Sequence, residues 1–230
     1  MARDGGAAGA TGAGLKGAAR RLLAAALGRV IIFVARLVTA VRGIWQGTEP
    51  VPARRVYFAN HSSNGDFVLI WTVLPPRLRA ATRPVAAADY WLKSPLRAFV
   101  GREVFNAVLI ERDREARSED PVAQMTAALD AGASLILFPE GTRNTTAEKL
   151  LPFRTGLYHL ARARPEVELV PVWIENLNRV MPKGEIVPVP LLCTVSFGAA
   201  LRIERGEAKE AFLMRARAAL LRLANGEGGP

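Results

Sequence analysis

The chain has 230 residues, of which 50% are hydrophobic and 23% are charged, and this composition excludes a disordered polymer. It is long enough for one sizeable domain with an appendage. Cys193 is the only cysteine, so the chain has no internal disulfide, and no Cys/His cluster indicates a metal site.

The N-terminal part carries most of the net charge of +10. The first 55 residues contain nine Lys or Arg and two Asp or Glu, or +7 of the total. Between Arg21 and Arg42 the arginines separate uncharged runs of seven, six and five residues, whereas a spanning helix needs roughly 20 mostly apolar residues. Nucleic-acid binders more often set basic residues among polar and exposed aromatic ones. The pattern therefore favours an anionic membrane surface as partner, and no nucleic acid.

We expect residues 1–14 to be a disordered Gly/Ala-rich tail. Residues 15–48 are predicted to be a membrane-associating amphipathic segment, formed by one helix or by a pair broken near Gly28, that lies in the interface. A transit-like leader and a helix that packs only on its own domain remain open as alternatives. The segment predicts a peripheral or monotopic protein at the cytoplasmic face of a membrane.

Residues 50–226 are assigned to one domain, in which apolar strands alternate with helices. Strands are predicted over 55–60, 83–89, 105–112, 134–141, 167–175 and 191–199. Helices are predicted over 67–74, 90–101, 116–131, 154–164 and 208–224. This alternation predicts an α/β fold with a mostly parallel central sheet flanked by helices.

His61 and Asp66 stand five residues apart at the end of the first of these strands. In a continuous helix their side chains would point about 140° apart, but the intervening Ser-Ser-Asn-Gly is typical of a turn. A turn would let Asp66 fold back, fix the tautomer of His61 and leave its other nitrogen free as a base. Alternatively, Asp66 only caps the next helix and His61 is an ordinary loop histidine.

The stretch "FPEGTR", residues 138–143, follows another apolar strand. Gly141 permits a positive φ or close approach of a ligand, Arg143 offers a planar fork suited to phosphate, and Glu140 can accept from a hydroxyl or pair with a cation. Arg112 ends a further predicted strand, so a parallel sheet would bring it to the same edge. Each of these residues alone could also be an ordinary solvated turn residue.

In this order the residues resemble the motifs of the glycerolipid acyltransferase family, best known from the 1-acylglycerol-3-phosphate acyltransferases. Asn60, His61 and Asp66 match Asn-His-x-x-x-x-Asp, and residues 138–143 match Phe-Pro-Glu-Gly-Thr-Arg in full. Residues 153–156 match the Phe-Lys-x-Gly segment that usually follows, with Arg in place of Lys, and "VPV" at 170–172 corresponds to the last motif. The resemblance covers roughly residues 50–200.

The resemblance implies a membrane-surface O-acyltransferase of phospholipid biosynthesis. It would transfer a fatty acyl group from acyl-CoA or acyl-carrier protein to the hydroxyl of a lysophospholipid, first of all 1-acylglycerol-3-phosphate, giving phosphatidate. His61 would be the general base and Asp66 would orient it. A thioester is already activated, so neither a cofactor nor a metal is expected. The implied substrate-binding residues are Arg112, Glu140, Gly141, Thr142 and Arg143.

The residues leave other functions open. The four residues between His61 and Asp66 are small and polar where the family often has an aromatic, so acceptors of the ornithine-lipid or lysocardiolipin type remain candidates. So do a thioesterase and a non-catalytic membrane-binding protein, whereas acylation of Ser62 or Ser63 is disfavoured, because residues adjacent to a base in sequence are seldom aimed at it. The polar segment 175–185 is a further candidate for contacts with the head group or the acyl donor. His159 and Cys193 are expected to be structural.

Overall fold

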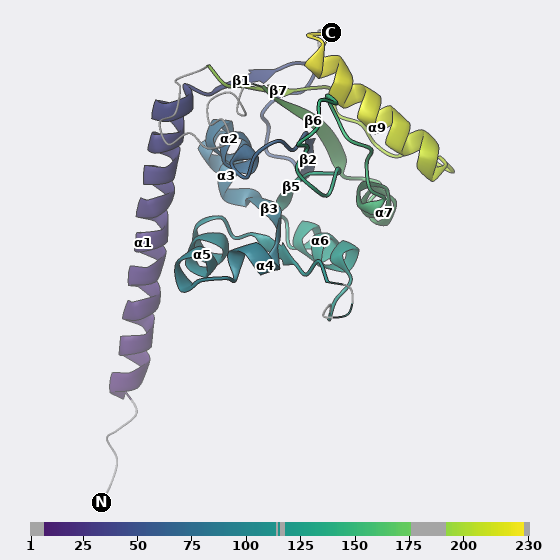
Figure 1. Cartoon of the computed structure of the whole chain (residues 1–230). Coiled ribbons are helices and arrows are strands. Elements are labelled where there is room, and N and C mark those ends of the chain that lie inside the picture. Colours follow the sequence, from purple (N-terminus) through teal and green to yellow (C-terminus); the bar gives the residue numbers. More distant parts are fainter. Residues whose placement is uncertain (1–6, 114, 116–117, 176–191, 228–230) are drawn as a thin grey trace, which may run out of the picture.

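The computed structural model describes residues 7–113, 115, 118–175 and 192–227 (Figure 1). In this part of the chain, a seven-stranded sheet has the strand order β1-β7-β6-β2-β5-β3-β4. The five strands β2 to β6 are parallel to one another, whereas β7 is antiparallel to β6, and β1 pairs in parallel with β7. The predicted α/β fold with a mostly parallel sheet is confirmed.

The elements alternate much as the sequence pattern predicts. The strands are β1 (Arg42–Trp45), β2 (Arg55–Ala59), β3 (Thr82–Ala87), β4 (Val108–Ile110), β5 (Ser134–Leu137), β6 (Glu168–Glu175) and β7 (Thr194–Phe197). The α-helices are α1 (Ala7–Thr39), α2 (Asp66–Val73), α3 (Pro76–Ala81), α4 (Ala88–Trp91), α5 (Pro95–Phe99), α6 (Pro121–Asp130), α7 (Gly156–Ala163) and α9 (Lys209–Ala224), with a π-helix, η1, at Val100–Val104.

Helices cover both faces of the sheet, and a hydrophobic core lies under each cover (Figure 1). On one face, Tyr57 and Ile70 belong to a cluster that α1, α2 and η1 enclose. On the other face, Phe58 and Phe212 belong to a cluster under α6, α7 and α9. Strand β2 is buried at every position, which explains its continuous apolar sequence, since a central parallel strand has no solvent face.

The N-terminal helix differs from the predicted segment at its start and in its middle. Helix α1 begins at Ala7, eight residues before residue 15, and runs unbroken to Thr39. The break considered near Gly28 is therefore wrong. Gly28 lies where α1 packs against α2 and η1, since a Cβ there would lie 3.4 Å from Trp71 and from Val104.

Only one side of α1 packs on the domain. Ala24 and Thr39 are buried, whereas Leu22, Phe33 and Leu37 are 72%, 66% and 69% exposed. By length and composition, the stretch Lys16–Thr39 could cross a membrane. Only 17% of its most apolar part is buried inside the protein. The low buried fraction argues against the alternative of a helix that serves only as a core element of its own domain.

Residues 42–45 form strand β1 instead of the helical structure predicted for residues 15–48. Their four residues pair with β7, from Arg42 opposite Thr194 to Trp45 opposite Phe197, and the two aromatic rings stack with centroids 3.9 Å apart. This strand depends on a partner that is about 150 residues away along the chain, which explains why its local sequence did not indicate it.

Candidate active site

The carboxyl ends of β2 and β5 carry the two principal motifs. These strands are adjacent and parallel, so the turn after Ala59 and the turn after Leu137 lie at the same edge of the sheet. The turns are joined directly, because the main-chain N–H of Asn144 donates to the carbonyl oxygen of His61 at 2.6 Å. The sheet therefore brings the histidine turn and the "FPEGTR" turn together, as the sequence predicted.

The chain turns between His61 and Asp66 and returns the carboxylate to the imidazole. Oδ2 of Asp66 accepts from Nδ1 of His61 at 2.9 Å and from the main-chain N–H groups of Ser62 and Ser63 at 2.7 and 2.8 Å. The carboxylate is fully buried. Gly65 occupies the cap position of α2, so Asp66 orients the histidine turn and does not act as the side-chain cap of the helix.

The imidazole of His61 is held on one nitrogen and available on the other. An ionised carboxylate only accepts hydrogen bonds, so Nδ1 carries the proton and donates it to Asp66. Within the described residues, Nε2 has no protein hydrogen-bond partner. The ring stacks on Phe138 with centroids 4.2 Å apart, and its side chain is 16% exposed. This geometry suits a general base that meets its substrate from one open side.

Glu140 lies beneath the histidine turn and is 2% exposed. Its Oε1 accepts from the main-chain N–H of His61 at 2.7 Å, and its Oε2 accepts from that of Leu151 at 2.9 Å. Burial raises the pKa of the Glu140 carboxyl above its usual value, and the two N–H donors offset part of this effect. These contacts indicate a positioning role for Glu140; its role in substrate binding stays a prediction.

Gly141 adopts a φ of +70°, and the side chain of Arg154 lies against it. The main-chain N–H of Arg154 donates to the carbonyl of Pro139 at 2.8 Å, and its Nε donates to the carbonyl of Glu140 at 3.4 Å. A Cβ on residue 141 would lie 2.4 Å from Cδ of Arg154. The backbone conformation therefore favours glycine, and a Cβ at this position would also displace the side chain of Arg154 from the turn.

The remaining predicted binding residues are exposed at the same edge. Thr142 and Arg143 follow Gly141 with exposed side chains, and Arg112 is exposed two residues after the end of β4. In the strand order, β3 and β5 separate β4 from β2, so Arg112 lies at the same sheet edge but not next to the histidine turn. The binding function of Arg112, Thr142 and Arg143 stays a prediction.

Two contributions to the site were not recognised as such from the sequence. Asn60 bridges β2 to β6, since its side chain donates to the carbonyl of Ile174 at 3.0 Å and accepts from that residue's N–H at 2.8 Å. Phe138 provides the surface on which the His61 ring stacks. Both residues stand inside the matched motifs, so the motifs did contain the signal, but only the register of the strands assigns these tasks.

The structure places the other sequence candidates as follows, apart from those outside the described residues. His159 is exposed on α7, and Cys193 is fully buried, which raises the pKa of its thiol to about 11. Among the described residues, no three His, Cys, Asp or Glu side chains gather as a metal site would require. The polar segment predicted at 175–185 lies outside the described residues except for Glu175.

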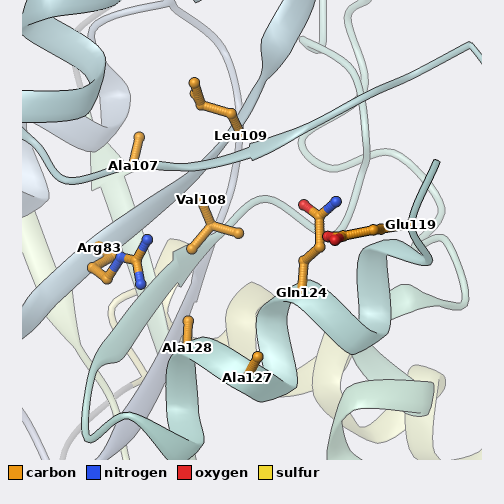
Figure 2. A pocket seen from close by; sticks show the side chains of 8 residues that line it. All are labelled: Arg83, Ala107, Val108, Leu109, Glu119, Gln124, Ala127 and Ala128. Carbon is orange, nitrogen blue, oxygen red and sulfur yellow. The ribbon is translucent and has the colours of Figure 1, made fainter. Parts of the chain in front are cut away.

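A pocket of about 430 Å³ lies between β3, β4 and α6, lined by Arg83, Val108 and Gln124 among others (Figure 2). Its lining comes from β3, from β4 with the residue before it, and from α6 with the segment before that helix. It contains none of the predicted site residues. The candidate active site is therefore the open edge around His61, and not this hollow.

Comparisons with known proteins identify curated relatives of this chain. Curated relatives named 1-acyl-sn-glycerol-3-phosphate acyltransferase include one from Cocos nucifera, 25% identical over 70% of this chain and 50% of the relative. Another, from Haemophilus influenzae, is 28% identical over 55% of this chain and 52% of the relative, and one from Escherichia coli is 30% identical over 54% and 51%. The chain thus spans about half the length of these relatives.

The crystal structure of the 1-acyl-sn-glycerophosphate (LPA) acyltransferase PlsC from Thermotoga maritima has a similar fold. It matches with a TM-score of 0.65 over 92% of this chain and 82% of that chain, at 18% sequence identity. A family model described as Acyltransferase matches residues 44–175, which is more than half of the chain and includes both turns of the site. This chain therefore belongs to the Acyltransferase family.

Proposed function

We propose that the protein is a membrane-surface O-acyltransferase that moves a fatty acyl group from a thioester to the free hydroxyl of a lysophospholipid. The donor is acyl-CoA or acyl-carrier protein, and the first-choice acceptor is 1-acylglycerol-3-phosphate, which gives phosphatidate. The names of the curated relatives support this acceptor. The observation that carries the proposal is the buried Asp66 carboxylate on Nδ1 of His61, with Nε2 left available.

In the proposed reaction, Nε2 of His61 removes the proton from the acceptor hydroxyl as its oxygen attacks the thioester carbonyl. The C–S bond then breaks, the oxygen–carbon bond remains, and the thiolate takes the proton back from the imidazolium. Asp66 keeps the ring oriented and stabilises its positive charge while the proton is there. General-base action of this kind is typically worth ~10²–10⁴-fold in rate.

The acceptor phosphate would lie against the exposed arginines of the site. Arg143 ends the "FPEGTR" turn, and Arg112 lies at the same edge after β4. A guanidinium group can bind two phosphate oxygens at once through two parallel N–H donors. Gly141 and Thr142 would line the glycerol portion of the acceptor. Glu140 would serve this subsite through the backbone of His61, to which it is already bonded.

Helix α1 would hold the enzyme in the membrane that contains its acceptor. Its outer side combines exposed Leu22, Phe33 and Leu37 with exposed Arg29 and Arg36, the mixture expected at an anionic lipid surface. We propose that the helix lies in the interface at the cytoplasmic face, because a central Arg costs ~2.5–3.5 kcal/mol in a spanning helix.

The two histidines of the chain provide a matched test. Purified protein should release free thiol from acyl-CoA only when 1-acylglycerol-3-phosphate is present, and His61→Ala should lower this rate by ~10²-fold or more. His159→Ala, on the exposed surface of α7, should keep the full rate. Normal turnover by His61→Ala would refute the assigned mechanism.

A panel of acceptors, read out by mass spectrometry of the products, decides between the competing functions. A stronger rate with an ornithine lysolipid or lysocardiolipin would replace the proposed acceptor. Thiol release without any acceptor would indicate a thioesterase. Vesicle binding without turnover on any acceptor would indicate a non-catalytic membrane-binding protein.

A further inference from the structure

The α4–α5 segment, residues 88–99, exposes large apolar side chains on the surface. Leu96 is 70% exposed, Leu92 43% and Tyr90 41%. These three side chains occur within seven residues, although single exposed hydrophobics are ordinary and only a group of them needs explanation. Trp91 packs edge-on against the ring of Tyr90, yet all three side chains stay exposed, so the segment presents an apolar surface to whatever lies outside the protein.

The charges around these side chains favour a lipid surface over an apolar protein surface. Lys93, Arg97 and Arg102 are exposed, and between residues 88 and 102 Asp89 is the only acidic residue. The guanidinium of Arg97 lies over the ring of Tyr90 at 4.7 Å. Leucine beside tyrosine and basic residues is the composition of segments that insert at the head-group level of anionic membranes.

The α4–α5 segment lies beside α1 on the same face of the sheet (Figure 1). Arg20 of α1 pairs with Glu103 at 3.1 Å and lies over the ring of Phe99 at 5.6 Å. These contacts place the end of α5 and η1 beside the N-terminal half of α1, and both helices expose leucine side chains, Leu23 of α1 at 60% and Leu96 of α5 at 70%.

The segment is also connected to the candidate active site. It follows β3, whose carboxyl end is at the same sheet edge as His61. Trp91 packs edge-on against Phe67, the residue after Asp66, with ring centroids 5.9 Å apart. A Cβ on Gly101 would lie 3.0 Å from Trp91, so this ring is closely held. A lipid surface under the segment would thus lie next to the edge that holds the base.

We propose that the α4–α5 segment is a second membrane-contact site, which inserts Tyr90, Leu92 and Leu96 into the head-group region of an anionic bilayer. Together with α1 it provides two points of contact with the membrane. With α1 alone the domain could rotate about the helix axis, whereas two points of contact fix its orientation. The sheet edge with His61 then faces the lipid. The role of this orientation in catalysis rests on the proposed function, whereas the contact itself does not.

A fluorescent label tests the contact directly. Cys193 is the only native cysteine and is fully buried, so Leu96→Cys can be labelled selectively with an environment-sensitive dye. Met214→Cys is the matched control, because Met214 is 67% exposed on α9, which covers the other face of the sheet. The probe is a vesicle of phosphatidylcholine and phosphatidylglycerol in equal parts.

We expect the dye at position 96 to shift to the blue and brighten severalfold when vesicles are added, and the dye at position 214 to stay unchanged. Unchanged emission at position 96 while the protein co-sediments with vesicles would overturn the proposal, as would a complete lack of co-sedimentation. A blue shift at high protein concentration without vesicles would show that a second copy of the protein covers the segment, and this result would also overturn the proposal.

A pair of serine substitutions measures the strength of the contact. Leu92→Ser with Leu96→Ser should lower the vesicle partition coefficient about tenfold or more, whereas Met214→Ser should leave it unchanged. The double variant should retain its turnover of detergent-dispersed lysophosphatidate and lose turnover when the acceptor is embedded in vesicles. If wild-type protein shows no turnover in detergent, the proposed function fails, while the label and partition results still decide the contact.

Discussion

Glu140 joins the two turns of the candidate active site, so its removal should lower both the free energy of unfolding and the activity. Oε1 and Oε2 accept from the N–H groups of His61 and Leu151 at 2.7 and 2.9 Å. A buried donor left without its partner costs about 1–3 kcal/mol. Because Glu140→Ala leaves two such donors without a partner, we expect it to lower the free energy of unfolding by about 2–6 kcal/mol. Glu140→Gln keeps one acceptor, so we expect about half of that loss.

The activity should fall for a different reason than the stability. The backbone of His61 is fixed by the Glu140 bond on its N–H and by the Asn144 bond on its carbonyl. Without Glu140 the imidazole loses one of these two constraints, and displacement of a catalytic group by about 1 Å costs up to about 10²-fold. We therefore expect kcat/KM per folded molecule to fall by roughly one to two orders of magnitude in Glu140→Ala.

Urea denaturation followed by circular dichroism measures the stability, and thiol release at temperatures where each variant stays folded measures the activity. Ser134→Ala is the matched control. Ser134 also holds buried backbone groups, of Arg55 and Ala53, but at the amino end of β5. The Ser134→Ala variant should lose about 1–3 kcal/mol of the free energy of unfolding and keep the wild-type kcat/KM. Glu140→Ala with wild-type kcat/KM would refute the positioning role.

Three further predictions concern the same turns. Gly141→Ala should lose more stability in urea than Gly132→Ala: both positions have positive φ, which costs about 1–2 kcal/mol, but a Cβ meets Arg154 at 2.4 Å only at Gly141, with nothing within 4 Å at Gly132. Asp66→Asn should lower kcat by up to about 10⁴-fold, as loss of the orienting carboxylate does in hydrolase triads, with the circular dichroism spectrum unchanged; a near-normal kcat would contradict the orienting role. Burial raises the pKa of Glu140, so the folded state binds its proton more tightly than the unfolded chain, and the stability of wild type relative to Glu140→Gln should fall as the pH rises from about 4.5; a rise would contradict the direction of the shift.

The local sequence was sufficient for the fold class and for the location of the site. The buried strand β2 and the strand β5 are continuous apolar runs, and in a parallel sheet such strands end at one edge. The turn composition between His61 and Asp66 allowed the carboxylate to return to the imidazole, and the structure has this contact at 2.9 Å. Each of these features depends on residues that are close together in the chain, so a short stretch of sequence is enough to predict it.

The three-dimensional arrangement decided what could not be read locally. Strand β1 exists because β7 provides its partner from a distant part of the chain, and α1 packs against α2 and η1, which follow it at a distance in the sequence. Such contacts join segments that are distant in sequence, so they cannot be predicted from secondary-structure propensity or hydrophobic periodicity, which are local.

The sequence by itself determined which residue types stand at the candidate site, because His61 and Asp66 have a spacing at which only a turn can bring the carboxylate to the imidazole. The tertiary structure decided what each neighbour does there. Glu140 had the residue type of a substrate ligand, yet the adjacency of β2 and β5 places its two oxygens on main-chain N–H groups of the site. A side chain's partners depend on which backbone the fold brings to it, and only the assembled sheet supplies that backbone.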